Sequence, residues 1–167
     1  MPKTLVIIRH GKSTWDYLNI SDLDRPLKEI GITNTILIAK KLNEKKILPD
    51  HIISSPANRA LHTALIVARE TCFKVENIAI DSTLYSENEN QILDMIYKTP
   101  ENINILFIFG HNPVFTDISN YFLRNKISNL PTSGCAVITF NCKEWNNISL
   151  VNYVSEMCFF PKTLNNE

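Results

Sequence analysis

Hydrophobic positions along the chain alternate between short continuous runs and runs at helical spacing. The run from Thr4 to Ile8 is apolar and β-branched, which is typical of a strand buried on both faces of a parallel sheet. From Leu27 to about Lys46, apolar residues recur every three or four positions between lysines and glutamates, which predicts a helix packed on that sheet. A second short strand is predicted at His51–Ser54. Ser55-Pro56 then predicts an N-cap and first turn, opening a helix that continues to about Glu70.

The second half of the chain repeats this alternation of strand and helix. The elements it predicts are, in order, a strand at Val75–Ile80, a helix at Gln91–Tyr97, a strand at Asn104–Phe109, a helix from Asn112-Pro113 to about Leu123, and a hairpin of Cys135–Phe140 with Ile148–Val154. Strands that alternate with helices predict an α/β fold, with a mostly parallel sheet covered on both faces and closed by an antiparallel edge.

Length and composition favour a single self-sufficient domain over residues 1–167, with a frayed tail after about residue 160. The 17 basic and 17 acidic residues balance, so no global charge draws the chain to nucleic acid. No apolar run approaches the ~20 residues of a membrane span, and the first run is too short for a signal peptide. The four cysteines lack metal-ligand or dithiol spacing. A cytoplasmic setting is therefore expected.

Unusual polar residues follow three of the predicted strands. They are Arg9 and His10 after the first strand, Ser55 and Arg59 after the second, and His111 after the fourth. In a parallel sheet, ligands bind beyond the carboxyl ends of the strands, so these side chains are expected to share one crevice. Guanidinium groups pair with phosphoryl oxygens, and helix starts offer free N–H donors. We therefore expect a site for phosphate, although no P-loop for a nucleotide triphosphate is present.

Histidine is one of the few side chains that can carry a covalent phosphoryl group. His10 is the stronger candidate nucleophile, because it directly follows a buried strand and because the charge of Arg9 favours the neutral imidazole. His111 is then expected to donate to a phosphoryl oxygen. Catalysis of phosphoryl transfer rests mostly on positioning and charge stabilisation, a role that Arg9, Arg59 and His111 would share.

Three segments resemble the motifs of the histidine phosphatase superfamily, the phosphoglycerate mutase-like group. They are Ile8-Arg9-His10-Gly11, Ser54-Ser55-Pro56 with Arg59-Ala60 and Thr63-Ala64, and Gly110-His111-Asn112-Pro113. The short chain and the segment Asp22-Leu23-Asp24-Arg25-Pro26-Leu27 are most similar to the SixA-like phosphohistidine phosphatases. The resemblance implies a three-layer α/β/α sandwich, no metal or other cofactor, and a phosphohistidine intermediate on His10. It also implies that Arg9, Arg59 and His111 bind the phosphoryl group and that Arg25 can approach the same anion.

The general acid is the part of this pattern that the sequence defines least. Larger members of the superfamily place a Glu or Asp after the third strand, where this chain has Glu87 and Glu89, and Glu87 is the preferred candidate. A phosphohistidine substrate expels imidazole, which leaves more readily than an alkoxide. A weak or absent acid would therefore bias the enzyme toward phosphoramidates.

The first hypothesis is a metal-independent phosphatase acting on protein phosphohistidine, with a histidine-phosphotransfer domain or a phosphorelay kinase as partner. A second reading keeps the site but assigns a small phosphate ester as substrate, such as a sugar phosphate or a nucleotide. A mutase is less favoured, because holding a bisphosphate away from water needs a closed pocket. The remaining alternative is a degenerate binding module that recognises phosphorylated partners without turnover.

Overall fold

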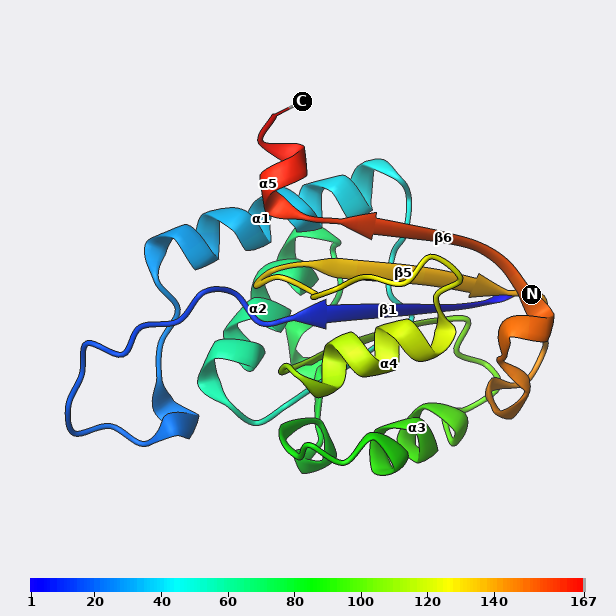
Figure 1. Cartoon of the computed structure of the whole chain (residues 1–167), viewed down its shortest axis with the longest axis horizontal. Helices are drawn as coiled ribbons and strands as arrows, with labels where there is room; N and C mark the ends of the chain where they lie inside the picture. Colours follow the sequence, from blue (N-terminus) through cyan, green and yellow to red (C-terminus); the bar gives the residue numbers. More distant parts are fainter. Residues whose placement is uncertain (167) are drawn as a thin grey trace.

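The computed structural model describes residues 1–166, which form one mixed six-stranded sheet with helices on both faces (Figure 1). The strands are β1 (Lys3–Arg9), β2 (His51–Ser54), β3 (Ala79–Ile80), β4 (Ile105–Gly110), β5 (Cys135–Phe140) and β6 (Tyr153–Phe159). Their order across the sheet is β3-β2-β4-β1-β5-β6, and the first four in this order are parallel. The antiparallel pair β5 and β6 forms the opposite edge, as the sequence predicted.

The parallel strands end next to one another. Arg9 at the end of β1 is in register with Gly110 at the end of β4, and Ser54 at the end of β2 is in register with Phe109. These registers bring the residues that follow the three strands to one edge of the sheet. That edge is where an α/β sheet binds its ligand.

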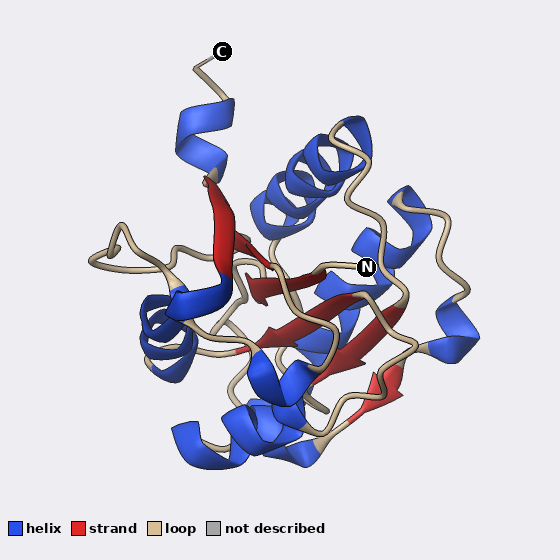
Figure 2. Ribbon diagram, turned by 90° about the vertical axis from the view of Figure 1, so that its right-hand side faces the viewer, coloured by secondary structure: helices blue, strands red, loops and turns tan. Residues whose placement is uncertain are grey.

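Two helical layers enclose the sheet, as Figure 2 shows in a view turned about the vertical axis from that of Figure 1. The helices are α1 (Glu29–Glu44), α2 (Asn58–Glu70), α3 (Glu89–Tyr97), α4 (Val114–Phe122) and the short α5 (Pro161–Leu164). Alternate residues of β1 pack on opposite layers: Leu5 and Ile7 against α3 and α4, Val6 and Ile8 against α1 and α2. A strand apolar on both faces thus joins two cores, which gives the α/β/α sandwich expected of the phosphoglycerate mutase-like fold.

Several predicted boundaries were wrong. Residues 75–80 form a single turn of 3-10 helix (Val75–Asn77) and the two-residue β3 instead of one strand. The second hairpin strand is β6, which begins at Tyr153 and not at Ile148, because Ile148 is buried in the core under α3 and α4. Beyond β6, residues Pro161–Leu164 form the short α5, and Leu164 packs on the core beside α1 and α2. Fraying of the tail after about residue 160 stays a prediction.

The starts of two helices also differ from the prediction. α2 begins at Asn58, so Ser55 is not its N-cap, and α4 begins at Val114, preceded by a cis Asn112–Pro113 peptide bond. Within the described part of the chain, no helix is long and apolar enough to cross a membrane.

Candidate active site

The candidate histidines come from neighbouring strand ends and are held together by the backbone. The amide of His10 donates to the carbonyl of Gly110 at 3.0 Å, and the amide of Ser55 donates to the carbonyl of Phe109 at 2.9 Å. The rings of His10 and His111 lie with their centroids 5.1 Å apart. Hydrogen bonds from the residues after β1 and β2 to the end of β4 therefore bring His10 and Ser55 beside His111, which follows β4, at the edge of the sheet.

The backbone of Gly11 selects the tautomer of His10. Nδ1 of His10 lies 2.7 Å from the carbonyl oxygen of Gly11, which can only accept a hydrogen bond. Nδ1 must therefore carry the ring proton when the imidazole is neutral. The lone pair is then on Nε2, and nucleophilic attack requires such an unprotonated nitrogen.

Burial keeps His10 neutral. The side chain is 9% exposed, and its desolvation is the largest cause that lowers its pKa, to about 4. The hydrogen bond to Gly11 opposes this shift, while the positive charges of Arg59, Arg9 and Arg25, in decreasing order, reinforce it. The sequence pointed to the charge of Arg9 as the reason for a neutral imidazole; the structure shows that burial contributes more.

His111 is held by a serine that had been assigned another role. Nε2 of His111 is 2.8 Å from Oγ of Ser55, and Nδ1 is buried with no hydrogen-bond partner in residues 1–166. Burial first, and then the neighbouring His10, lower the pKa of His111 to about 3. Tyr85 packs edge-on against the ring, with centroids 5.5 Å apart. His111 is therefore a second neutral imidazole, and its Nδ1 is a buried polar atom without a partner among the described residues.

Arg9 is partly buried beside His10, and burial lowers the pKa of its guanidinium. One terminal nitrogen donates to the carbonyl of Leu130 at 3.0 Å. Its Nε is buried and has no acceptor in the described chain. A buried donor without a partner is costly, so this atom is a place where an anion would be stabilised.

Arg25 and Arg59 come from different parts of the chain and meet at one carboxylate. Asp22, in the 3-10 turn Asp22–Asp24, lies 2.9 Å from a terminal nitrogen of Arg25 and 3.0 Å from one of Arg59. Tyr85 donates its hydroxyl to the same carboxylate at 2.8 Å. Both arginines are less than one-tenth exposed, so their terminal nitrogens have fixed positions.

The crevice consists of two adjoining hollows. The first, of about 360 Å³, contains Arg9, His10, Arg25, Arg59 and His111, which are five of the six predicted site residues. The second, of about 320 Å³, shares Arg59, His111 and Asn112 with the first and contains Glu87. Glu87 is exposed there, next to the hollow with the nucleophile candidate and not inside it.

Sequence reasoning missed two polar residues of this crevice, namely Asp22 and Tyr85. Asp22 is three positions before Arg25, a spacing that allows their ion pair within the segment that resembles the SixA-like proteins. Ser55 was predicted to lie at the crevice and to cap a helix, but its hydrogen bond to His111 was not predicted. No local signal marks Tyr85, whose hydroxyl reaches Asp22 across 63 positions of the chain.

Gly11 packs closely against both α1 and α2. A Cβ at Gly11 would lie 2.9 Å from the carbonyl oxygen of Gly31 and 3.0 Å from Oγ1 of Thr35, both in α1. Its amide donates to Oγ1 of Thr63 in α2 at 2.9 Å. The residue after the nucleophile candidate is thus clamped between two helices.

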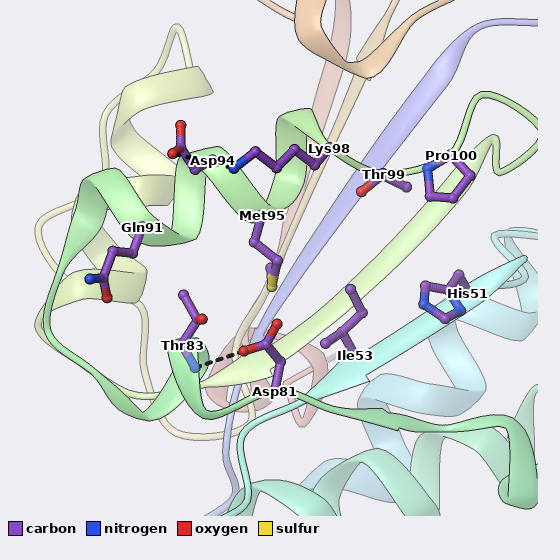
Figure 3. Close-up of a pocket in the computed structure, with 10 residues that line it drawn as sticks. All are labelled: His51, Ile53, Asp81, Thr83, Gln91, Asp94, Met95, Lys98, Thr99 and Pro100. Atoms are coloured by element: carbon purple, nitrogen blue, oxygen red, sulfur yellow. Dashed lines mark hydrogen bonds and ion pairs between the residues drawn. The ribbon is translucent and has the colours of Figure 1, made fainter.

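A larger hollow, of about 580 Å³, lies between α3 and β2, and Asp81, which follows the edge strand β3, also lines it (Figure 3). It contains none of the predicted site residues. Its charged rim is an exposed ion pair of Asp94 and Lys98, 3.8 Å apart on the same helix. In residues 1–166, no group of three or more His, Cys, Asp or Glu side chains could hold a metal ion.

Comparison with known proteins finds one family that is similar to the first half of the chain. The sequence profile of the histidine phosphatase superfamily (branch 1) matches residues 5–84, the part that contains Arg9, His10, Arg25 and Arg59. An uncharacterized chloroplastic protein of Arabidopsis thaliana is 27% identical over 152 residues, which are 86% of this chain and 69% of the relative. A 2,3-bisphosphoglycerate-dependent phosphoglycerate mutase of Chlamydia felis is 33% identical over 108 residues. The match covers 59% of this chain and about half (47%) of the mutase.

Solved structures with the same fold cover nearly the whole chain. The protein histidine phosphatase SixA, complexed with tungstate, superposes with a TM-score of 0.78 at 20% identity, over 96% of this chain and 99% of SixA. A putative SixA from Agrobacterium tumefaciens gives 0.76 at 24% identity, over 93% and 99%. A mycobacterial glucosyl-3-phosphoglycerate phosphatase gives 0.67 at 14%, over 95% and 98%. The first half of the chain is thus similar to the histidine phosphatase superfamily, and the fold of the chain is that of the SixA proteins.

Proposed function

We propose that the chain is a metal-independent phosphatase that forms a phosphohistidine on His10 and acts on protein phosphohistidine. The observation that carries the proposal is the state of His10. It is a buried neutral imidazole whose Nδ1 is tied to the Gly11 carbonyl, so that the lone pair is on Nε2, in a hollow that also contains three arginines. The family supports phosphoryl chemistry at such a site.

The proposed reaction has two steps: phosphoryl transfer to His10, and hydrolysis of the phosphohistidine. The lone pair of Nε2 of His10 forms a bond to phosphorus while the bond from phosphorus to the leaving atom breaks, and the leaving group takes the electron pair and gains a proton. Water then attacks the phosphohistidine, the N–P bond breaks, and its electron pair returns to Nε2 as inorganic phosphate departs. Arg9, Arg59 and the free Nδ1 of His111 stabilise the charge on the phosphoryl oxygens in both steps.

Arg25 and Glu87 have lesser roles in this proposal. Arg25 supports the phosphoryl site from the far side of Asp22 and stacks over Trp15. Glu87 supplies the leaving-group proton for an ester. It is dispensable for phosphohistidine, since a neutral imidazole is a far better leaving group than an alkoxide.

A protein substrate is supported by the loop that borders the crevice. Large apolar side chains are exposed along it, and they are Trp15, Tyr17, Leu18, Ile20 and Leu23. Trp15 also lines the hollow that contains His10. Contiguous exposed apolar residues beside a functional site mark a surface that binds protein, and aromatic residues are enriched in such surfaces.

A small phosphate ester remains the second candidate substrate. The observation in its favour is that a glucosyl-3-phosphoglycerate phosphatase has the same fold. The mutases match this chain over less than half of their own length, and both hollows of the crevice are open, so we do not propose a mutase.

The test is phosphate release without added metal, from a phosphorylated histidine-phosphotransfer protein and from a panel of small esters. We expect faster release from phosphohistidine, and an acid-labile, base-stable phosphoryl label on the quenched enzyme. His10→Ala should lose both, whereas His62→Ala, a control on α2, should lose neither. Hydrolysis of esters alone would make the chain a small-molecule phosphatase. Phosphate binding without turnover of any substrate would make it a binding module.

A further inference from the structure

The two hollows of the crevice differ in charge. The hollow above His10 contains five cationic side chains and no carboxylate among its described residues; the cations are Arg9, Lys12, Arg25, Lys28 and Arg59. The adjoining hollow contains two carboxylates, Asp22 and Glu87, beside the hydroxyls of Tyr85 and Ser86. Its cation is Arg59, which both hollows share. The crevice is therefore cationic at one end and acidic at the other.

Asp22 is the fixed member of the acidic end. Its carboxylate is 43% exposed, yet two arginines and one tyrosine hold it in place. Burial alone would raise its pKa, but hydrogen bonds from Tyr85, Arg25 and Arg59 outweigh this effect and lower the pKa to about 2. The negative charge is thus present at every pH at which the enzyme would work.

Because His10 lines the cationic hollow only, the two hollows of the crevice would hold different parts of the substrate. A phosphoryl group in reach of Nε2 of His10 occupies the cationic hollow. Arg59 and His111, which would bind its oxygens, line both hollows, so the remainder of the substrate has the acidic hollow directly beside it. That remainder is the leaving group.

We propose that the hollow of Asp22 and Glu87 is the leaving-group subsite, and that it selects phosphoryl compounds whose leaving group is cationic or a neutral hydrogen-bond donor over those that carry further anionic groups. The inference rests on the proposed phosphatase function and names its substrate class. An imidazole that departs with a proton meets a carboxylate in this subsite. A carboxylate or a second phosphate on the leaving group meets like charge.

The selection is tested with three alkyl phosphates of similar size: phosphoethanolamine, glycerol 3-phosphate and 3-phosphoglycerate. Their leaving groups are cationic, neutral and anionic. In a partly solvated site, one favourable or unfavourable charge contact changes the binding free energy by about 1 kcal/mol. The first step of the series loses an attraction to the carboxylates and the second adds a repulsion, so kcat/KM should fall by about fivefold at each step. In Asp22→Asn, the kcat/KM values of successive esters in the series should differ by no more than about twofold.

Asp24→Asn is the matched control. Asp24 lies in the same turn and its carboxylate accepts only the hydroxyl of Ser21, at 2.8 Å, among the described residues. It lines neither hollow of the crevice. The control should retain the full charge preference, as should Asp94→Asn at the distant hollow of Figure 3. A loss of activity that is equal for the three esters would mean that Asp22 only positions the arginines, and it would overturn the inference.

The inference and the proposed function fail in different ways. If phosphohistidine is hydrolysed but the three esters react in a flat or reversed order, the function stands and the subsite does not. If nothing is hydrolysed, the function fails, and calorimetric binding of the same three compounds decides the subsite: tightest binding of phosphoethanolamine supports it, and equal or reversed affinities overturn it. Glu87→Gln gives the same comparison if Asp22→Asn does not fold.

Discussion

Nδ1 of His10 lies 2.7 Å from the carbonyl oxygen of its own neighbour, Gly11. A single backbone acceptor thereby decides which nitrogen of the imidazole is nucleophilic. The backbone of Gly11 is held in place on two sides. It packs so closely on α1 that no Cβ atom would fit between them, and its amide donates a hydrogen bond to Thr63. Orientation of the nucleophile is therefore a property of the fold and needs no acidic partner.

Replacement of His10 by alanine tests the nucleophile. Turnover should fall below about one thousandth of the wild type, since the variant lacks the Nε2 atom that forms the covalent bond. The change removes one hydrogen bond, so the free energy of unfolding should change by only about 1 kcal/mol. Steady-state rates and urea unfolding curves check both parts. Wild-type rates in the variant would refute the assignment.

Ser55→Ala tests the support of His111. The variant leaves both nitrogens of His111 without a protein partner, and we expect kcat to fall about tenfold with little change in stability. Ser119→Ala is the control, because Ser119 is a buried serine on α4 whose hydroxyl donates to the carbonyl of Phe115 at 2.7 Å. If both variants lose the same activity, the hydroxyl of Ser55 has no special role.

Glu87→Gln tests the proton donor. Ester hydrolysis should slow by about 100-fold, the usual contribution of a general acid, while phosphohistidine hydrolysis should slow by less than about threefold. The measurement is kcat for alkyl phosphate esters, whose leaving group is an alkoxide, and for a phosphorylated histidine-phosphotransfer protein. Glu89→Gln, in the first turn of α3, is the nearby control. Equal losses on both substrates would count against the leaving-group argument.

The sequence predicted those parts of the site that depend on local order. Arg9, His10 and His111 directly follow strands apolar enough to be recognised, and the sheet register then brings them together. The position of Asp22 was not predictable in this way, because ion pairs to Arg25 and Arg59, the latter 37 positions away, determine it. Non-local pairs of charges leave no periodic signal in the sequence.

The wrong boundaries have a related cause. Ser55 was a good helix cap by its neighbours, but its hydroxyl bonds to His111, which comes from another strand. Ile148 began an apolar run typical of a strand, but the core under α3 and α4 buries it before β6 starts. In both cases a tertiary partner outweighed the local preference.

The buried histidines predict how stability depends on pH. The folded pKa of His10, about 4, is below the ordinary value of about 6.5, so the unfolded chain binds the proton first as the pH falls. The free energy of unfolding should therefore decrease between pH 6.5 and pH 4, by at most about 3 kcal/mol from His10. Urea unfolding at pH 7, 6, 5 and 4 measures this decrease. His111, whose folded pKa is about 3, contributes to the same decrease, so His10→Ala should reduce the slope by about half. An unchanged slope would contradict the assigned cause.

Gly31→Ala tests the coupling between α1 and the nucleophile. A Cβ at Gly31 would lie 2.7 Å from the amide nitrogen of Lys12 and closer still to its carbonyl oxygen, which accepts the amide of Lys28 at 2.8 Å. Backbone atoms cannot swing aside as a side chain does. The strand-end segment must therefore shift, and we expect a loss of about 3 kcal/mol in stability together with a fall in kcat.

Thr33→Ala is the control for this variant, because Thr33 is exposed on the same helix and its hydroxyl only returns to the carbonyl of Glu29. It should change the free energy of unfolding by less than about 0.5 kcal/mol and leave kcat unaltered. Differential scanning calorimetry and steady-state rates compare the two. If Gly31→Ala lost stability but kept its kcat, the 10–12 segment would tolerate displacement, and the orientation of His10 would depend on Gly11 and Thr63 without help from α1.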